Sequence, residues 1–233
     1  MPRRDDLNTI LVLGSGPIKI GQAAEFDFSG SQAVRALRED GYEVILVNSN
    51  PATIQNDPEM ADRVYIEPLL PDTVRKILEI EKPDALLAGM GGQTALNIAS
   101  ELSHDGTLER LNVELIGSDL DAIDKAEDRE LFNQVCESID LPISQAIACN
   151  SMEEVIKAAE EIGSWPILIR PAFTLGGLGG GTAFDMGQLV EIATLGLRNS
   201  RINQVLIEES ILGWQELEYE VMRDTADNAT IVC

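Results

Sequence analysis

The stretch ILVLGSG, residues 10–16, decides the fold class of the first part of the chain. Four aliphatic residues in a row are typical of a strand that is buried on both faces, as in a parallel sheet covered by helices. The glycines that follow them indicate a turn at the end of this strand. We therefore take residues 10–13 as the first strand of an α/β domain.

Short apolar runs of the same kind recur at residues 44–47, 85–87 and 113–116. The chain between these runs is long enough for crossover helices, which parallel strands require. Helix signals lie there too, with apolar periodicity before Gly41 and a proline-initiated segment over residues 71–82. The order of elements predicts a Rossmann-like, doubly wound α/β domain with a parallel sheet.

The pattern changes near residue 127, where a charged stretch precedes a new helix, so we expect domains over residues 1–127 and 128–233. In the second domain, Ser151 and Glu154 predict a capping box for a helix that ends at Gly163. The remaining predicted elements are a strand at 167–169, a helix at 187–198, a strand at 205–207 and a strand through Leu217, Tyr219 and Val221. This mixture predicts an α+β domain.

Composition excludes several classes of function. The 233 residues include 40 acidic and 17 basic side chains, and the resulting net charge of −23 disfavours nucleic-acid binding. The three cysteines are far apart, which fits neither a disulfide framework nor a zinc site and favours a reducing cytoplasm. The apolar run at residues 10–13 is too short for a signal or membrane segment, so we expect a cytoplasmic protein.

Three loops follow predicted strands. Gly14, Gly16 and Gly21 have the spacing G-x-G-x-x-x-x-G, which departs from both the dinucleotide fingerprint and the Walker loop. A tight turn and a phosphate-binding turn remain alternatives for this cluster. The segments VNSNPATI (47–54) and MGGQTALN (90–97) are placed where open α/β sheets bind ligands, although each also contains ordinary turn residues.

The strongest local signal is RPAFTLGGLGGGTA, residues 170–183, with five glycines within residues 176–181. Glycine N–H groups can close over a polyphosphate without obstruction by side chains, and Arg170 supplies a permanent positive charge. A flexible surface linker is the alternative, but a linker does not require the apolar strand WPILIR that precedes it. The pattern favours a phosphate-binding flap.

Two further segments carry candidate groups. The predicted strand at 205–207 runs into a hinge whose backbone groups can bind adenine, and the carboxylate of Glu216 can accept hydrogen bonds from a ribose diol. Arg129 can pair with a phosphate or with the acids of its own helix. His104, the only histidine, lies among polar neighbours, and we expect it at the surface without a role in a site.

The segments resemble the large chain of carbamoyl-phosphate synthetase, and they occur in the same order. The resemblance covers nearly the whole sequence and is closest to the first half of that internally duplicated chain. It implies a Rossmann-like pre-ATP-grasp domain followed by an ATP-grasp domain. The segments that carry it are LVLGSGPIKIGQAAEFDFSGSQA, VNSNPATIQNDPEMADRVYIEP, MGGQTALN, DAIDKAEDR and IRPAFTLGGLGGG.

The resemblance implies a ligase that uses ATP to activate bicarbonate as carboxyphosphate. Ammonia from a glutaminase small subunit then gives carbamate, and a second ATP gives carbamoyl phosphate for arginine and pyrimidine biosynthesis. It also implies Mg²⁺ or Mn²⁺ and possible higher oligomers. The positions that match the family's ATP contacts are Arg129, Arg170, Gly176, Gly177, Glu209, Ile211 and Glu216, with both arginines catalytic beside phosphates and Glu216 beside the ribose.

The sequence departs from the family in two ways. Trp165 replaces a more usual phenylalanine or tyrosine, and the chain stops at Cys233 within an apolar run. By resemblance, we expect a truncated ATP-grasp domain that lacks its metal ligands and is inactive as a fragment. The alternatives are another ATP-grasp ligase such as a biotin carboxylase, a non-catalytic nucleotide-sensing module, and an NAD-dependent oxidoreductase built on the first glycine turn.

Overall fold

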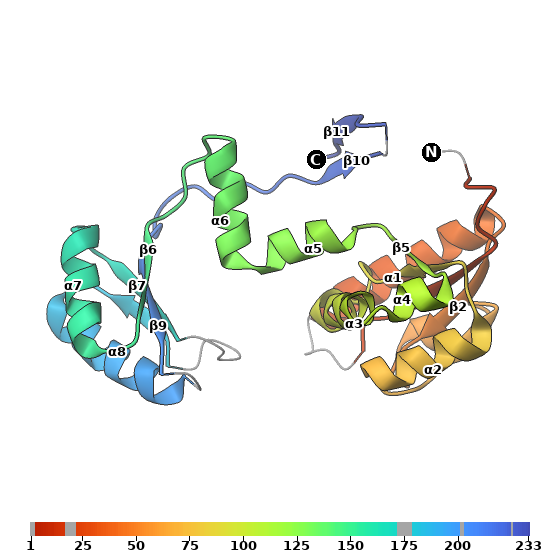
Figure 1. The fold of residues 1–233 in the computed structure, drawn as a ribbon, viewed down its shortest axis with the longest axis horizontal. Helices are drawn as coiled ribbons and strands as arrows, with labels where there is room; N and C mark the ends of the chain where they lie inside the picture. The colour runs from red at the N-terminus through yellow and green to blue at the C-terminus, as the bar shows by residue number, and fades with distance from the viewer. Residues whose placement is uncertain (1–2, 17–21, 172–178, 201–202, 225) are drawn as a thin grey trace. The chain divides into compact units, whose positions relative to one another are not determined.

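A computed structural model describes residues 3–16, 22–171, 179–200, 203–224 and 226–233 (Figure 1). These residues belong to two compact units, Met1–Ile139 and Asp140–Cys233. None of the helices in the described ranges is long and apolar enough to cross a bilayer. We describe each unit by itself.

The first unit contains a five-stranded parallel sheet with the order β3-β2-β1-β4-β5. The chain builds outward on one side of β1 and then on the other, as in a doubly wound fold. Four strands confirm the prediction, whereas the three-residue edge strand β3 was not predicted because it has no apolar run. The strands are β1 (Thr9–Leu13), β2 (Glu43–Val47), β3 (Arg63–Tyr65), β4 (Ala85–Leu87) and β5 (Glu114–Ile116).

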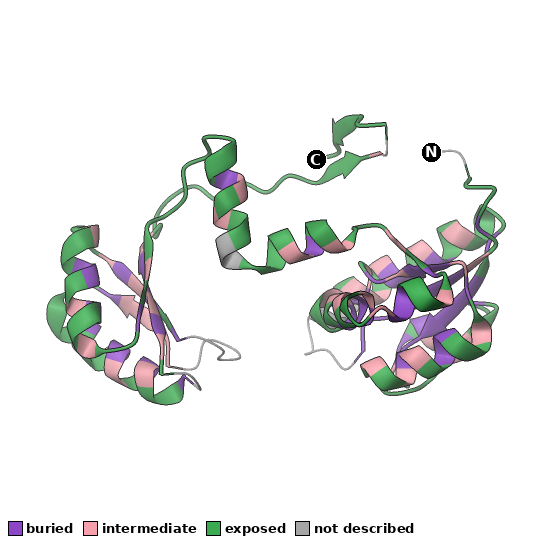
Figure 2. Cartoon of the chain, viewed as in Figure 1, coloured by how far each residue is buried: buried purple, intermediate pink, exposed green. Residues whose placement is uncertain are grey.

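Helices cover both faces of this sheet, and the central strands are buried between them (Figures 1 and 2). Along β1, Leu11 and Leu13 belong to one apolar cluster, and Ile10 and Val12 belong to the cluster on the opposite face. This arrangement explains the unbroken apolar run. The helices are α1 (Gln22–Glu39), α2 (Pro71–Glu81), α3 (Gly92–His104), α4 (Thr107–Leu111), α5 (Leu120–Glu127) and α6 (Arg129–Ser138), with a 3₁₀ turn η1 (Ile54–Asn56).

Helix α2 shows how local sequence sets the ends of an element. Pro71 occupies its first turn, where a missing N–H does no harm. Lys82 follows its last residue with φ of 49°, and its N–H donates to the Leu78 carbonyl. Pro83 comes next and disfavours further helix. The predicted helix over residues 71–82 is therefore confirmed.

The second unit contains a four-stranded antiparallel sheet with the order β6-β9-β7-β8. Helices α7 and α8 pack on one face of it (Figure 1), which confirms the α+β prediction. Strands β6 and β8 were not predicted, because β6 is short and mostly exposed or half-buried and β8 has three small or polar residues. The elements are β6 (Ala146–Cys149), α7 (Met152–Ile162), β7 (Ile167–Pro171), β8 (Gly181–Ala183), α8 (Met186–Asn199) and β9 (Val205–Glu209), with a further antiparallel pair, β10 (Val221–Arg223) and β11 (Ala229–Ile231).

The start of α7 confirms half of the predicted capping box. The Ser151 hydroxyl accepts a hydrogen bond from the Glu154 N–H at 3.2 Å. The Glu154 carboxylate, however, accepts from the Asn150 N–H at 2.6 Å, one residue earlier than a full capping box requires. Gly163 ends the helix with φ of 66°, as predicted.

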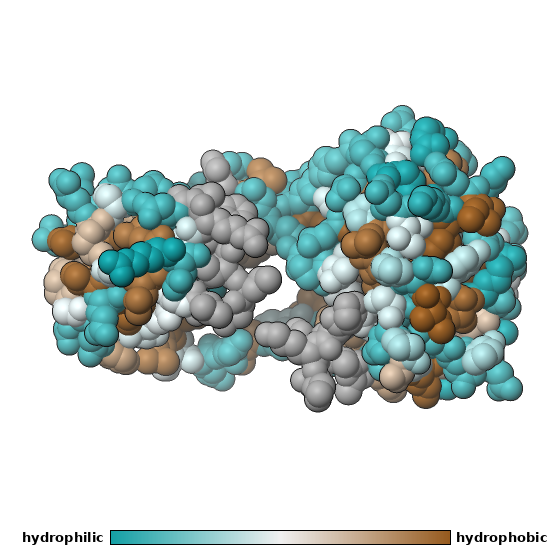
Figure 3. Space-filling model, turned by 90° about the horizontal axis from the view of Figure 1, so that it is seen from below, coloured by the Kyte–Doolittle hydropathy of each residue, from teal (hydrophilic) through white to brown (hydrophobic). Residues whose placement is uncertain are grey.

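The predicted strand through Leu217, Tyr219 and Val221 is wrong in its first part, because strand β10 begins only at Val221. A strand needs a partner for its backbone groups, and alternation alone does not supply one. The pairing extends only to Glu220, whose N–H donates to the Cys233 carbonyl at 3.0 Å. Leu217 and Tyr219 are exposed, and Figure 3 shows apolar side chains at the surface of both units.

Candidate nucleotide site

Arg170 lies on strand β7 and faces away from α7 and α8. Its strand neighbours Ile167 and Ile169 belong to the core beneath these helices, and the two-residue period of the strand places Arg170 on the opposite face. Its Nε atom lies 2.9 Å from Oε2 of Glu208 on β9. Because Arg170 pairs with Leu206 in the sheet, Glu208 is its diagonal neighbour.

This ion pair is unequal in its exposure. The Glu208 side chain is 10% exposed and the Arg170 side chain is 56% exposed. A carboxylate withdrawn from water requires a partner of opposite charge, so Arg170 stabilises the sheet. In the part of the chain that the structure describes, the two terminal amino groups of Arg170 donate no hydrogen bond. The Arg170 side chain thus stabilises the sheet through its ion pair, and its terminal amino groups can donate hydrogen bonds to an oxyanion.

The segment after β9 forms a tight turn. The Glu209 N–H donates to the Gln145 carbonyl at 2.8 Å, which ties the strand end to the start of β6, and the Trp214 N–H donates to the Ile211 carbonyl at 3.0 Å. Gly213 adopts φ of 87°, which glycine tolerates. Within the described part of the chain, the Ile211 N–H has no acceptor. This N–H can donate a hydrogen bond to a ring nitrogen of adenine, so the residues present fit a nucleotide base.

The remaining predicted site residues are Glu216, Arg129, Gly176 and Gly177. Glu216 is exposed, and it lies outside any helix or strand. Arg129 begins α6 in the first unit, where only its backbone is described. Gly176 and Gly177 lie outside the described residues. The structure therefore places Arg170, Glu209, Ile211 and Glu216 in the second unit and Arg129 in the first.

The charged stretch before Leu131 does start a helix, as predicted. Asp128 ends α5, and its Oδ1 atom accepts a hydrogen bond from the Leu131 N–H at 2.9 Å, so it caps the start of α6. Its carboxylate thus has a structural role directly beside Arg129. The preceding helix α5 was not predicted.

Sequence reasoning missed Glu208. The signal was present, because two acids end the apolar strand at residues 208 and 209. Side chains alternate between the faces of a strand, so one of two adjacent acids has to lie on the face that carries Arg170. The pairing register of β7 and β9, which the sequence does not reveal, decides that it is Glu208.

Buried amide side chains hold the backbone directly after β1. Asn48 Oδ1 accepts hydrogen bonds from the N–H groups of Gly16 and Asn50, both at 3.1 Å, and its Nδ2 donates to Gln55 Oε1 at 3.1 Å. Gly16 has φ of 65°. Gly14 and Gly16 therefore lie at the end of β1 as predicted, Gly21 lies outside the described residues, and the tight turn and the phosphate-binding turn both stay predictions.

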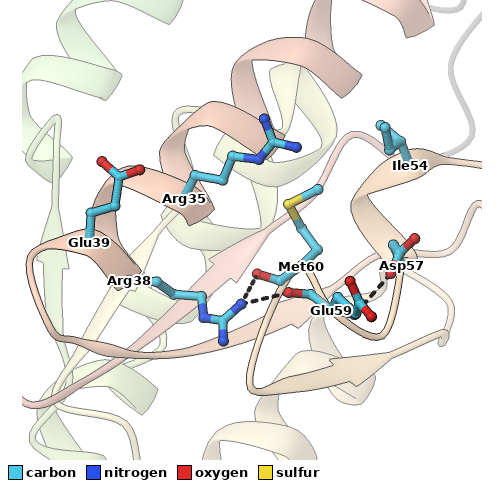
Figure 4. A pocket seen from close by; sticks show the side chains of 7 residues that line it. All are labelled: Arg35, Arg38, Glu39, Ile54, Asp57, Glu59 and Met60. Atoms are coloured by element: carbon cyan, nitrogen blue, oxygen red, sulfur yellow. Dashed lines mark hydrogen bonds between the residues drawn. The ribbon is translucent and has the colours of Figure 1, made fainter.

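No predicted site residue lines the cavity of about 360 Å³ between α1 and η1 (Figure 4). Arg38 there donates to the carbonyls of Glu59 at 2.6 Å and Met60 at 3.0 Å. His104 lies at the surface, as predicted, with Nε2 3.2 Å from Asp124 Oδ2. Across the described ranges, no group of three or more His, Cys, Asp or Glu side chains is arranged to hold a metal ion.

Comparison with known proteins gives matches along the whole chain. The family model described as carbamoyl phosphate synthase preATP-grasp domain matches residues 6–125, and the one described as carbamoyl-phosphate synthase L chain, ATP binding domain, matches residues 128–233. The carbamoyl phosphate synthase large chain of Archaeoglobus fulgidus is 60% identical over 233 residues, which are 100% of this chain and 22% of that protein.

A second relative comes from Aquifex aeolicus and is named carbamoyl phosphate synthase large chain, N-terminal section. It is 55% identical over all 233 residues, which cover 42% of its length. The chain thus spans less than half of the length of these two curated relatives.

A similar solved structure is the biotin carboxylase domain of Hydrogenobacter thermophilus 2-oxoglutarate carboxylase, in complex with MgADP and bicarbonate. The TM-score is 0.71 at 18% identity, over 98% of this chain and 49% of that one. This likeness concerns the fold.

Proposed function

The chain belongs to the carbamoyl phosphate synthase large-chain family, and from this premise we propose that it carries residues of the first ATP site of such an enzyme. At this site a bicarbonate oxygen attacks the γ-phosphorus of ATP, ADP leaves, and carboxyphosphate forms. The observation that carries the proposal is 55% identity, over the whole chain, to a protein named as the N-terminal section of the large chain.

Arg170 binds phosphate oxygens in this proposal. Its terminal amino groups donate no hydrogen bond to a described residue, which supports that role, because phosphoryl transfer depends on positioning and on neutralising charge that develops on oxygen. Arg129 is proposed to act on the phosphates as well. Gly176 and Gly177, which lie outside the described residues, are proposed to bind the phosphates through their backbone N–H groups.

The turn after β9 binds the nucleoside. The Ile211 N–H has no acceptor among the residues described, which supports a hydrogen bond to the adenine ring, and the neighbouring backbone of Glu209 completes the hinge. The exposed carboxylate of Glu216 accepts hydrogen bonds from the ribose hydroxyls. These groups hold the base and sugar, so that the reacting phosphate lies at Arg170.

The later steps require parts and partners beyond these residues. Ammonia from a glutaminase small subunit attacks carboxyphosphate, phosphate leaves, and carbamate forms. A second ATP then phosphorylates carbamate to carbamoyl phosphate. A divalent ion, Mg²⁺ or Mn²⁺, supplies charge neutralisation at the ATP phosphates when bound. We also propose possible higher oligomers.

The functional division is proposed at residues 127 and 128, which the limits of the two family matches support. Contacts divide the chain slightly later, between Ile139 and Asp140, because α6 packs on α5. A cytoplasmic setting is proposed as well, and it is supported by three cysteines that are all free.

The test is bicarbonate-dependent ATP hydrolysis by the complete gene product that contains this sequence. We expect hydrolysis to rise with bicarbonate and to fall at least 100-fold in Arg170→Ala, on the scale of losing an oxyanion donor. Because the substitution also removes the ion pair with the largely buried Glu208, circular dichroism has to show that the variant is folded. Arg198→Ala, an exposed arginine on α8, is the matched control.

Other outcomes separate the alternatives. ATP hydrolysis that requires biotin as well as bicarbonate would indicate a biotin carboxylase. ATP binding without hydrolysis by the complete product would indicate a nucleotide-sensing module. Either result would contradict the proposal.

A further inference from the structure

We propose that Glu208 is a positioning residue that orients the guanidinium group of Arg170 toward the phosphates of ATP. The inference rests on the proposed function and deepens it. Glu208 was not among the predicted site residues, and we infer that it fixes the conformation of Arg170, which was.

The geometry separates the two ends of the guanidinium group. Glu208 Oε2 lies 2.9 Å from Nε, the nitrogen nearest the aliphatic stem of Arg170. Neither of the two terminal amino groups donates a hydrogen bond to another of the described residues. A carboxylate that engages the stem end restrains the side chain and leaves the fork that suits a phosphate.

Both side chains are placed by the sheet and not by a loop. Arg170 lies opposite Leu206 on β9, and Glu208 lies opposite Leu168 on β7, so the pair is diagonal across two central strands. The Glu208 side chain is 10% exposed, and a carboxylate with so little access to water has few alternative positions. The ordering of Arg170 is thus established on folding, which reduces the entropy that is lost when ATP binds.

A second ion pair in the chain provides a comparison. Arg63 on β3 lies opposite Ile45, and its Nη2 atom lies 2.7 Å from Oε1 of the diagonal Glu43 on β2. Here the Glu43 side chain is 47% exposed, and the Nε atom of Arg63 also pairs with Glu81 at 3.0 Å. The guanidinium of Arg63 is occupied at both ends. Glu43→Gln is therefore a matched control with the same chemical change in the other unit.

The experiment uses the complete gene product and measures kcat and KM for ATP in bicarbonate-dependent hydrolysis. The variants are Glu208→Gln, Arg170→Lys, the double variant and the Glu43→Gln control. We expect Glu208→Gln to lower kcat/KM about tenfold. In the Arg170→Lys background, which lacks the guanidinium to be oriented, Glu208→Gln should lower it by less than twofold. Glu43→Gln should match the parent.

A merely structural role for Glu208 predicts a different pattern. The losses would then multiply, so Glu208→Gln would lower kcat/KM by the same factor in both backgrounds, and this result would overturn the inference. Parent-like kinetics of Glu208→Gln would overturn it too. If Glu208→Gln does not fold, Glu208→Asp keeps the charge on a shorter stem, and the same test of additivity applies.

The proposed function and this inference fail in distinguishable ways. A parent enzyme without bicarbonate-dependent hydrolysis overturns the proposed function, and the inference falls with it. An active parent with additive or absent effects of Glu208→Gln overturns the inference alone.

Discussion

Gln55 is a buried polar side chain that the local packing holds on two sides. It is 0% exposed, its Oε1 atom accepts from Asn48 Nδ2, and its Nε2 atom donates to the Phe26 carbonyl at 2.8 Å. A Cβ atom on Gly14 would lie 2.6 Å from Oε1, and a Cβ atom on Gly30 would lie 2.6 Å from Nε2. The backbone after β1 and the backbone of helix α1 can therefore both approach the Gln55 side chain this closely only because both positions are glycine.

We expect Gly30→Ala to destabilise the first unit. Alanine favours a helix by about 1 kcal/mol over glycine, but the contact with Gln55 displaces a hydrogen-bonded amide, and such overpacking costs about 1–3 kcal/mol. The midpoint of urea unfolding, followed by far-UV circular dichroism, should therefore fall. Gly89→Ala is the control, since a Cβ there meets nothing within 4 Å. A higher midpoint for Gly30→Ala would contradict the prediction.

Cys149 illustrates a thiol kept protonated by its surroundings. It is 0% exposed, and burial raises the pKa of the Cys149 thiol from 9.0 to about 11. A raised pKa stabilises the folded state below pH 9, and this contribution is lost as pH rises from about 9 to about 11.

At pH 8 we expect an aromatic disulfide reagent to modify only Cys233 rapidly in the folded chain, because Cys136 and Cys149 are buried and Cys233 is exposed. All three thiols should react in 6 M guanidinium chloride, which serves as the control. Rapid modification of Cys149 in the folded chain, detected by peptide mass spectrometry, would show the burial to be wrong.

At the scale of elements, the sequence predicted those with strong local signals. The apolar runs of β1, β2, β4, β7 and β9 identify strands because burial on both faces or under helices demands aliphatic residues. Strands β3, β6 and β8 were missed because they are short edge strands of three or four residues that depend on partners distant in the sequence. The alternation of apolar and polar residues at 217–221 led to a wrong prediction, because no strand among the described residues pairs with its first part.

Prediction of the site from the sequence was limited in the same way, by contacts between residues that are distant in the chain. Arg170 and the turn after β9 were predicted from motif and resemblance, and the structure describes both. Glu208 was missed because its contact depends on the register of β7 against β9, which local sequence does not encode.

Helix α7 provides a test of capping. We expect Ser151→Ala to lower the stability of the second unit by about 1 kcal/mol, because the Glu154 N–H loses the hydroxyl that caps it. Trp165 and Trp214 are the only tryptophans, and both belong to the second unit, so tryptophan fluorescence during urea unfolding reports on it selectively. Ser164→Ala, an exposed serine just after the helix, is the control. Equal midpoints for the two variants would contradict the prediction.

At the scale of the whole molecule, we expect repulsion between acidic side chains to decide how the stability of the folded state changes with salt. The excess of 40 acidic over 17 basic residues produces repulsion that the compact state increases. Exposed ion pairs such as Arg110 with Glu79 are worth at most about 1 kcal/mol each, and salt weakens them too. The net effect of screening should therefore be stabilising.

We expect the urea midpoint to rise when NaCl is raised from about 10 mM to about 150 mM, over which the screening length shortens from about 30 Å to about 8 Å. A variant with Glu160→Gln and Glu161→Gln, which removes two exposed charges from α7, should start from a higher midpoint and gain less from salt. A midpoint that falls with salt would show that ion pairs outweigh repulsion.

The contact of Gln55 with Gly14 and Gly30 also bears on how this family can diverge. A lineage that acquires alanine at either glycine first passes through a strained protein, whereas one that first shortens residue 55 opens the space that alanine needs. The order of mutations thus decides which are tolerated. Across related sequences, a larger residue at position 14 or 30 should accompany a smaller one at position 55.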